Sequence, residues 1–232
     1  MPNTGYQRSR KGGTGTRRGS GRVRIIAGRL GGRRVQVPDA PGLRPTPERT
    51  RETLFNWLQG RLDGARILDL FAGSGILAFE ALSRGAALAV LVERDPRVAA
   101  QLRASADELG LVHDANRDRD PDPDPDASAD GAPAEARIVR GDALTWLERA
   151  DPRAGFDLVL LDPPFSAQLA RPALALLAAG TLLDAEARIY CEWAAADPEP
   201  WDAASYEVLR EARAGDSRAA LLCRRSPADP GP

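Results

Sequence analysis

The chain has 232 residues and a formal net charge of −1 at pH 7. That length suffices for one domain with a core large enough to fold without disulfides or metals. A single histidine argues against histidine-based triads and histidine-ligated metal centres, so we expect no metal site. No apolar run approaches the ~18 residues of a membrane span, and the basic, glycine-rich N-terminus has no signal-peptide core. The sequence therefore predicts a cytoplasmic protein with no membrane partner.

The near-zero net charge hides a basic N-terminal region. Residues 1–38 contain ten Arg or Lys and no Asp or Glu. Residues 1–21 are too polar and too rich in glycine to bury a core, so we expect a disordered basic tail. An acid-free basic arm is typical of proteins that contact a polyanion.

A small N-terminal unit is predicted over residues 22–64. Two short β-prone runs flank a Gly-Arg-Leu-Gly-Gly turn within residues 22–38 and indicate a β-hairpin. A helix should follow, because Thr46 is a suitable N-cap and Pro47 suits the first helical position. Its buried stripe repeats every fourth residue, at Leu54, Leu58 and Leu62.

From residue 65 onward, short aliphatic strands alternate with helices. Strands are expected over 65–71, 87–93, 136–141, 156–162 and 187–193, and an antiparallel C-terminal hairpin should turn at Gly215–Asp216. This pattern predicts a Rossmann-like, doubly wound α/β domain over residues 65–226, with a mostly parallel seven-stranded sheet covered by helices on both faces. Residues 113–133 are rich in Asp and Pro and should form a disordered acidic insertion, and residues 227–232 a C-terminal tail.

A glycine loop follows the first strand of this domain. The segment from Gly73 to Ala78 matches G-x-G-x-x-A, placed between a strand and a helix. Glu93 ends the next strand, 18 residues after Gly75. Glycines let the backbone approach a ligand, and a strand-terminal carboxylate accepts hydrogen bonds from ribose hydroxyls. The loop alone does not distinguish NAD from S-adenosylmethionine.

Two further acids favour S-adenosylmethionine. Asp69 lies just before the loop, where dinucleotide-binding folds usually continue apolar, and suits a cationic amino-acid tail. Asp142 follows the third strand, where its carboxylate could bind an adenine amino group or could merely cap the next helix. Acids at three successive strand ends suit a ligand composed of an amine, a ribose and an adenine.

The fourth strand ends in Asp162-Pro163-Pro164-Phe165, which suits methylation of a planar amine. An exocyclic amine is a poor nucleophile because its lone pair is conjugated with the ring. Asp162 and the Pro163 carbonyl could accept its N–H groups and aim the lone pair, and the prolines would hold both acceptors rigid. Phe165 offers a face on which an unstacked base can lie.

The motifs LDLFAGSG, VERD and DPPF, in this order, resemble class I S-adenosylmethionine-dependent N-methyltransferases. RIIAGRLGGRRVQVP and LRPTPERTRETLFNWL narrow the resemblance to the bacterial small-subunit ribosomal RNA guanine-N2 methyltransferases of the D type. The resemblance implies S-adenosylmethionine as cofactor and 16S rRNA as partner, within a 30S particle or assembly intermediate. It implies a catalytic Asp162, Pro163, Pro164 and Phe165, and a cofactor site of Asp69, Phe71, Gly73, Gly75, Glu93, Arg94, Asp142 and Ala143.

The resemblance also bears on RNA binding and on the alternatives. The segment from Arg44, Pro45 and Thr46 to Glu52 would lie against the cofactor and target entrance. RNA contacts are predicted for Arg24, Arg29, Arg33, Arg34, Arg44, Arg49 and Arg51. The alternatives are a DNA adenine-N6 methyltransferase, a protein-glutamine methyltransferase, an NAD-dependent oxidoreductase and a non-catalytic RNA-binding module. We expect a monomer, because no apolar stripe is left unexplained.

Overall fold

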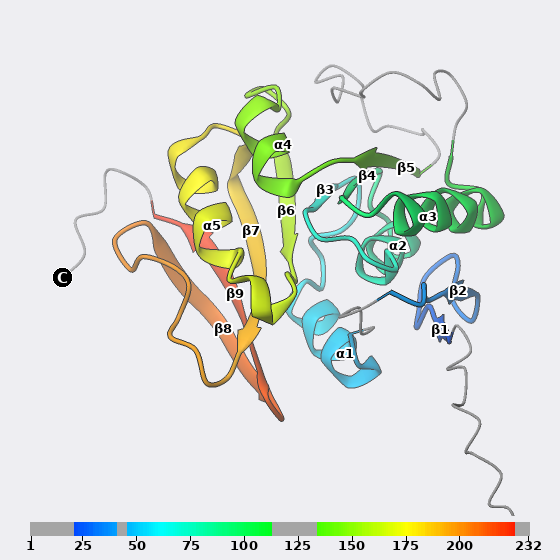
Figure 1. Cartoon of the computed structure of the whole chain (residues 1–232), viewed down its shortest axis with the longest axis horizontal. Coiled ribbons are helices and arrows are strands. Elements are labelled where there is room, and N and C mark those ends of the chain that lie inside the picture. The colour runs from blue at the N-terminus through cyan, green and yellow to red at the C-terminus, as the bar shows by residue number, and fades with distance from the viewer. Residues whose placement is uncertain (1–20, 41–45, 113–133, 226–232) are drawn as a thin grey trace, which may run out of the picture.

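A computed structural model of the chain describes residues 21–40, 46–112 and 134–225 (Figure 1). The predicted disordered tail (1–21, apart from Gly21), acidic insertion (113–133) and C-terminal tail (227–232) lie outside the described residues. The described strands are β1 (Arg22–Arg24), β2 (Arg34–Gln36), β3 (Arg66–Asp69), β4 (Leu88–Glu93), β5 (Glu135–Arg140), β6 (Phe156–Leu161), β7 (Leu183–Ala194), β8 (Tyr206–Ala214) and β9 (Ser217–Arg224). The helices are α1 (Glu48–Trp57), α2 (Ile76–Ser83), α3 (Pro96–Leu109), α4 (Ala143–Arg149) and α5 (Ala170–Ala179), with a 3₁₀ turn η1 (Phe165–Ala167).

Seven of the described strands form one sheet in the order β5-β4-β3-β6-β7-β9-β8. The five strands from β5 to β7 are parallel, whereas β9 pairs antiparallel with both β7 and β8. The β8–β9 hairpin turns between Ala214 and Ser217. The predicted mostly parallel sheet with an antiparallel C-terminal hairpin is therefore confirmed.

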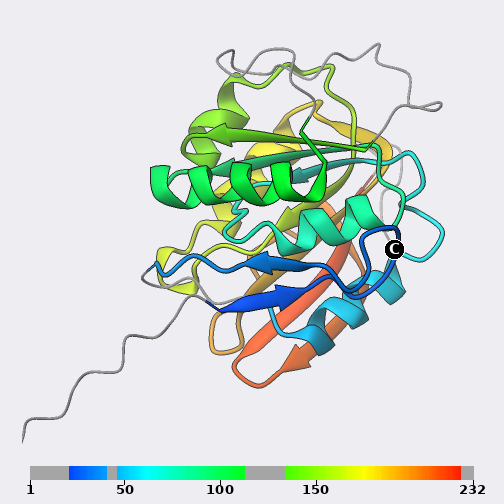
Figure 2. The same ribbon diagram turned by 90° about the vertical axis from the view of Figure 1, so that its right-hand side faces the viewer.

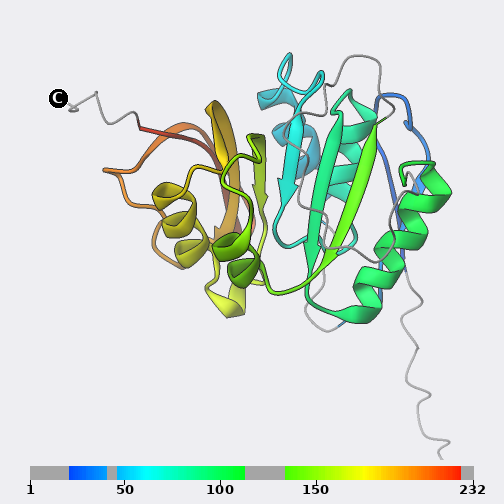
Figure 3. The same cartoon turned by 90° about the horizontal axis from the view of Figure 1, so that it is seen from above.

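Helices cover both faces of the sheet, as expected for buried parallel strands (Figures 1 and 3). On one face α1, α2 and α3 pack against side chains such as Ile67, Leu160 and Tyr190. On the other face α4 and α5 pack against side chains such as Val90 and Val159. In the described part of the chain, each helix is too short or too polar to cross a membrane.

The N-terminal hairpin of β1 and β2 is attached to α2 by buried polar groups, and Figure 2 shows it lying along that helix. The Glu80 carboxylate is fully buried and accepts the backbone N–H groups of Ile26 (2.7 Å) and Ala27 (3.0 Å). The Ser83 hydroxyl accepts the Leu30 N–H (2.8 Å) and donates to the Ala27 carbonyl (2.6 Å). The hairpin therefore has a fixed position relative to the helix that follows the glycine loop.

Gly28 allows this close approach. It has a φ of 81°, and a Cβ atom there would lie 1.9 Å from the Ser83 carbonyl oxygen. Both the left-handed backbone and the absence of a side chain are therefore required at this position.

Candidate active site

The site lies where the chain order of the sheet reverses. From β3 the chain builds outward through β4 and β5, and it then returns to place β6 on the other side of β3. Ligands of open α/β sheets bind at such a point, beyond the carboxyl ends of the strands. Asp69 ends β3 and Asp162 directly follows the neighbouring β6. The structure thus brings these two predicted acids to the two sides of the switch point.

Asp69 is a buried acid for which none of the described residues provides a cationic partner. Asp69 is only 3% exposed, and its carboxylate accepts the backbone N–H of Phe71. Burial is the main cause that raises its pKa to about 8, and the nearby carboxylates of Asp162 and Glu93 add to the rise. A ligand that brings a cation to this carboxylate would be stabilised by it.

The glycine loop holds the Glu93 carboxylate in place. Gly73 donates its N–H to Glu93 Oε2 (3.1 Å), and the Asp95 N–H binds Oε1 (2.8 Å). Gly75 has a φ of 75°, and a Cβ there would lie 2.6 Å from the side chains of Phe79 and Leu102. The Gly75 position is therefore required by packing beneath α2 as well as by its backbone conformation.

The remaining predicted cofactor residues line the same end of the sheet but differ in exposure. Asp142 caps α4, with Oδ1 accepting the N–H groups of Leu144 and Thr145 at 3.1 Å each. The capping role that the sequence allowed for this residue is thus what the structure shows. Ala143 is buried at the start of α4, Phe71 is half-buried and Arg94 is exposed.

Asp162 is held by a residue from the N-terminal unit. The Thr46 hydroxyl donates to Asp162 Oδ2 at 3.0 Å. The prediction of Thr46 as the N-cap of α1 was wrong, because Pro47 occupies that position and the hydroxyl points to the strand end instead. Burial raises the pKa of Asp162 to about 6, and the bond from Thr46 opposes part of that rise.

The rest of the tetrapeptide makes a rigid corner with an exposed ring. Pro163 is buried, whereas Pro164 is exposed and precedes the η1 turn. Phe165 is 40% exposed, one of two large hydrophobic side chains in the described chain that are this accessible. An exposed ring three residues after Asp162 is suited to act as a stacking surface.

Sequence reasoning missed Glu192, which lies beside Asp162. Leu161 pairs in register with Cys191, so the two acids are the next residues of adjacent parallel strands. Glu192 is 4% exposed and accepts the hydroxyls of Tyr190 (2.5 Å) and Ser217 (3.3 Å). Burial and the charge of Asp162 raise the pKa of Glu192 to about 8. A glutamate within the apolar run IYCEW was the available signal.

The arginines predicted to bind RNA fall into three groups. The exposed members are Arg24, Arg29, Arg33, Arg34 and Arg49. Arg24 also pairs with Glu48 (2.9 Å). Arg44 and Pro45 lie outside the described residues.

Arg51 requires a correction. It is 1% exposed, lies 3.5 Å from Glu80 and donates to the Arg24 carbonyl (2.9 Å). The guanidinium is therefore enclosed by protein and is not available to a phosphate. It helps attach α1 and the hairpin to α2, and the arginine-rich helix pattern did not distinguish this role from RNA binding.

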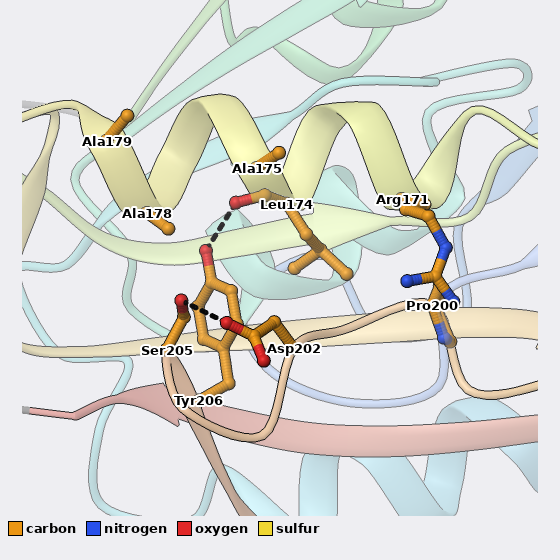
Figure 4. Close-up of a pocket in the computed structure, with 9 residues that line it drawn as sticks. All are labelled: Arg171, Leu174, Ala175, Ala178, Ala179, Pro200, Asp202, Ser205 and Tyr206. Atoms are coloured by element: carbon orange, nitrogen blue, oxygen red, sulfur yellow. Dashed lines mark hydrogen bonds between the residues drawn. The ribbon is translucent and has the colours of Figure 1, made fainter.

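A cavity of about 450 Å³ lies between α5 and the segment leading into β8 (Figure 4). The Tyr206 hydroxyl donates to the Leu174 carbonyl (2.7 Å) there, and Ser205 donates to Asp202 (3.1 Å). None of the predicted site residues lines this cavity. It is therefore separate from the acids at the switch point.

The fold, the glycine loop and the acids at the strand ends define a class I S-adenosylmethionine-dependent methyltransferase. The family described as Conserved hypothetical protein 95 matches residues 23–223, and the chain belongs to this family. It is 39% identical to ribosomal RNA small subunit methyltransferase D of Escherichia coli K12 over 85% of this chain and 87% of that protein. It is 38% identical to the protein of the same name from Haemophilus influenzae, over 74% and 79%.

Solved structures agree with this assignment. The Escherichia coli protein yhhF superposes with a TM-score of 0.70 at 35% identity, over 88% of this chain and 98% of that chain. SMU.776, solved in complex with SAH, superposes with a TM-score of 0.57 at 15% identity, over 83% of this chain and 53% of that chain. The second likeness shows the shared fold.

Proposed function

We propose that this protein transfers a methyl group from S-adenosylmethionine to the N2 amine of a guanine in the small-subunit ribosomal RNA. One observation carries the proposal. Asp162, bound by Thr46, lies at the switch point, beside the strand that ends in the buried acid Asp69 and three residues before the exposed ring of Phe165. A cationic cofactor and a flat base could thus meet at one carboxylate.

The residues present fit S-adenosylmethionine. Asp69 would hold the amino-acid ammonium, because a buried acid gains most from a cationic partner. Glu93, already oriented by two backbone N–H groups, would accept the ribose hydroxyls. Phe71, Gly73, Gly75, Arg94 and Ala143 would border the cofactor. Asp142 would contribute to the cofactor site indirectly, by capping the start of α4.

When bound, the cofactor supplies an electrophilic methyl group on a sulfonium. Asp162 and the Pro163 carbonyl would accept the two N–H groups of the guanine amine and turn its lone pair toward that carbon. The amine nitrogen would take the methyl group from the sulfonium, which would become a neutral thioether, and Asp162 or water would take the surplus amine proton. Phe165 would stack on the base after it is unstacked from the RNA. Positioning and electrostatics supply most of the acceleration.

The relatives and the charge distribution support ribosomal RNA as the substrate. The curated relatives are named as ribosomal RNA small subunit methyltransferases, and SMU.776 was solved with SAH, the demethylated cofactor. The exposed arginines of the hairpin would hold phosphates, which positions RNA without reading its sequence. We further propose a 30S particle or assembly intermediate as the substrate and a monomer in the cytoplasm as the working form.

The direct test is methyl transfer from tritiated S-adenosylmethionine to 30S particles that lack the modification. Naked 16S rRNA and unmethylated DNA are run beside them, and the product nucleoside is identified by mass spectrometry. We expect N2-methylguanosine in rRNA. N6-methyladenine in DNA would keep the mechanism and contradict the substrate. Binding of the cofactor without transfer to any of the three acceptors would contradict the proposed reaction.

The affinity for S-adenosylmethionine is expected to rise with pH up to about 8, the pKa of free Asp69. Below that pH the carboxyl is protonated and neutral, so it attracts the ammonium weakly. Above it the carboxylate is charged, and binding a cation lowers its pKa further and releases a proton. Calorimetry between pH 6 and pH 9 in buffers of different ionisation enthalpy would measure both effects.

Asp69→Asn is the matched control for this pH dependence. It keeps the side-chain volume and removes the titrating group, while the ammonium of the ligand still titrates. For this variant we expect weaker binding and no rise in affinity between pH 6 and pH 8. A wild-type affinity that stays flat across this range would contradict the role of Asp69.

A further inference from the structure

We infer that a cavity between α1 and the tip of the β8–β9 hairpin binds the ribose-phosphate of a nucleotide next to the methylated guanine. This inference rests on the proposed function and extends it to a second contact with the RNA. The cavity measures about 170 Å³, and its lining includes Arg49, Thr50, Trp57, Tyr190, Arg213 and Ser217.

The order of strands places this cavity beside the catalytic acid, on the side away from the cofactor. Along the carboxyl edge of the sheet, Glu93 and Asp69 come first, Asp162 is in the middle, and β7, β9 and β8 follow. Ser217, the first residue of β9, pairs with Ala194 at the end of β7, so the β8–β9 turn lies at this same edge. A strand of RNA whose base reaches Asp162 would therefore continue over the cavity.

Three hydrogen bonds lie between the cavity and the catalytic site. Thr46, which binds Asp162, lies one turn before Arg49 and Thr50 at the start of α1. Tyr190 and Ser217 line the cavity and both donate to Glu192, the buried neighbour of Asp162. A group in the cavity would thus be only a few side chains from the reacting amine.

The charge of the cavity fits an anion. Arg49 on α1 and Arg213 on β8 are both exposed and approach it from opposite walls, and Figures 1 and 2 show these elements side by side. Neither forms an ion pair with a carboxylate in the described chain, whereas the nearby Arg218 pairs with Glu199 (3.3 Å) and Glu211. Arg49 and Arg213 therefore keep their charge available for a phosphate.

The other lining groups fit a sugar more closely than a base. The Thr50 hydroxyl can donate to a phosphate oxygen. The Ser217 hydroxyl, which already donates to Glu192, can accept from a 2′-hydroxyl. The half-buried Trp57 offers an apolar surface. The cavity is smaller than the roughly 300–1,000 Å³ that encloses a whole small ligand. One ribose-phosphate unit of a longer chain is the occupant that matches its size and charge.

The test compares Arg49→Ala, Arg213→Ala and the double variant as methyltransferases on 30S particles and on naked 16S rRNA. For the double variant we expect the KM for RNA to rise about tenfold or more, as for loss of a charge-assisted contact. The kcat and the affinity for S-adenosylmethionine should stay within about twofold, because the contact is equally present before and during the reaction. The slope of log binding constant against log salt should fall by roughly one.

Three further variants make the result specific. Arg49→Lys with Arg213→Lys keeps the charge and should restore most of the RNA affinity. Ala212→Leu narrows the cavity without changing charge and should also raise the KM for RNA. Arg149→Ala removes an exposed arginine at the far end of α4 and should leave the KM unchanged.

The outcomes separate this inference from the proposed function. If the wild type methylates rRNA but the double variant keeps its KM and salt slope, the cavity does not bind the substrate. If the wild type transfers no methyl to rRNA, the proposed function fails and the inference fails with it.

Discussion

Replacement of Asp162 by alanine is expected to lower kcat for methyl transfer about 100-fold or more, the range seen when one positioned polar group is removed from a reaction centre. The affinity for S-adenosylmethionine should be unchanged or slightly tighter. Asp162 helps to raise the pKa of Asp69, so its removal favours the charged form of the acid that would bind the ammonium. Single-turnover kinetics and equilibrium binding of the cofactor would measure the two quantities separately.

Two variants refine the Asp162 experiment. Asp162→Asn keeps one acceptor and the shape, so a smaller loss of kcat is expected. Thr46→Val removes the hydroxyl that stabilises the carboxylate, so the pKa of Asp162 should rise above about 6. The acid limb of the rate profile should then move to higher pH. An equal loss of turnover and cofactor affinity in Asp162→Ala would mean that the carboxylate belongs to the cofactor site.

The parts of the site that the sequence predicted are local in the chain. Gly73 and Gly75 follow β3 directly, Glu93 ends β4, and Asp162 follows β6, so each position is set by one strand and the turn after it. Parallel strands bring such turns to the same edge of a sheet. The register of β3 with both β4 and β6 confirms that the three strand ends meet.

The parts that the sequence did not predict depend on contacts between distant segments. Thr46 and Asp162 are 116 positions apart in the chain. The sequence alone does not distinguish a threonine that caps a helix from one whose hydroxyl binds a distant carboxylate. Arg51 has the spacing of a surface arginine, yet it is enclosed by Glu80 and the Arg24 carbonyl. The position of Glu192 beside Asp162 follows only from the pairing of β6 with β7, which the sequence does not give.

Replacement of Glu80 by alanine is expected to destabilise the protein by about 3–5 kcal/mol, the cost of breaking a buried ion pair from one side. Glu80 accepts two backbone N–H groups, from Ile26 and Ala27, and binds Arg84 Nε at 2.8 Å. It also lies 3.5 Å from Arg51, a buried cation whose Nε atom has no hydrogen-bond partner among the described residues. Without the carboxylate, the two backbone donors would lose their acceptor and the buried Arg51 would lose its counter-charge. Urea unfolding measures the loss.

Hydrogen exchange distinguishes the loss of this anchor from a general weakening of the core. In Glu80→Ala the amides of Ile26 and Ala27 should lose protection before those of the central strands, because their acceptor is the removed carboxylate.

Glu80→Gln should have an intermediate stability, since its amide keeps one acceptor oxygen and turns a donor toward the arginines. Glu52→Ala, an exposed change on α1, should stay within about 0.5 kcal/mol of the wild type. If Glu80→Ala were as stable as Glu52→Ala, the hairpin and α1 would have to be fixed by apolar packing alone. The KM for RNA would then be independent of this carboxylate.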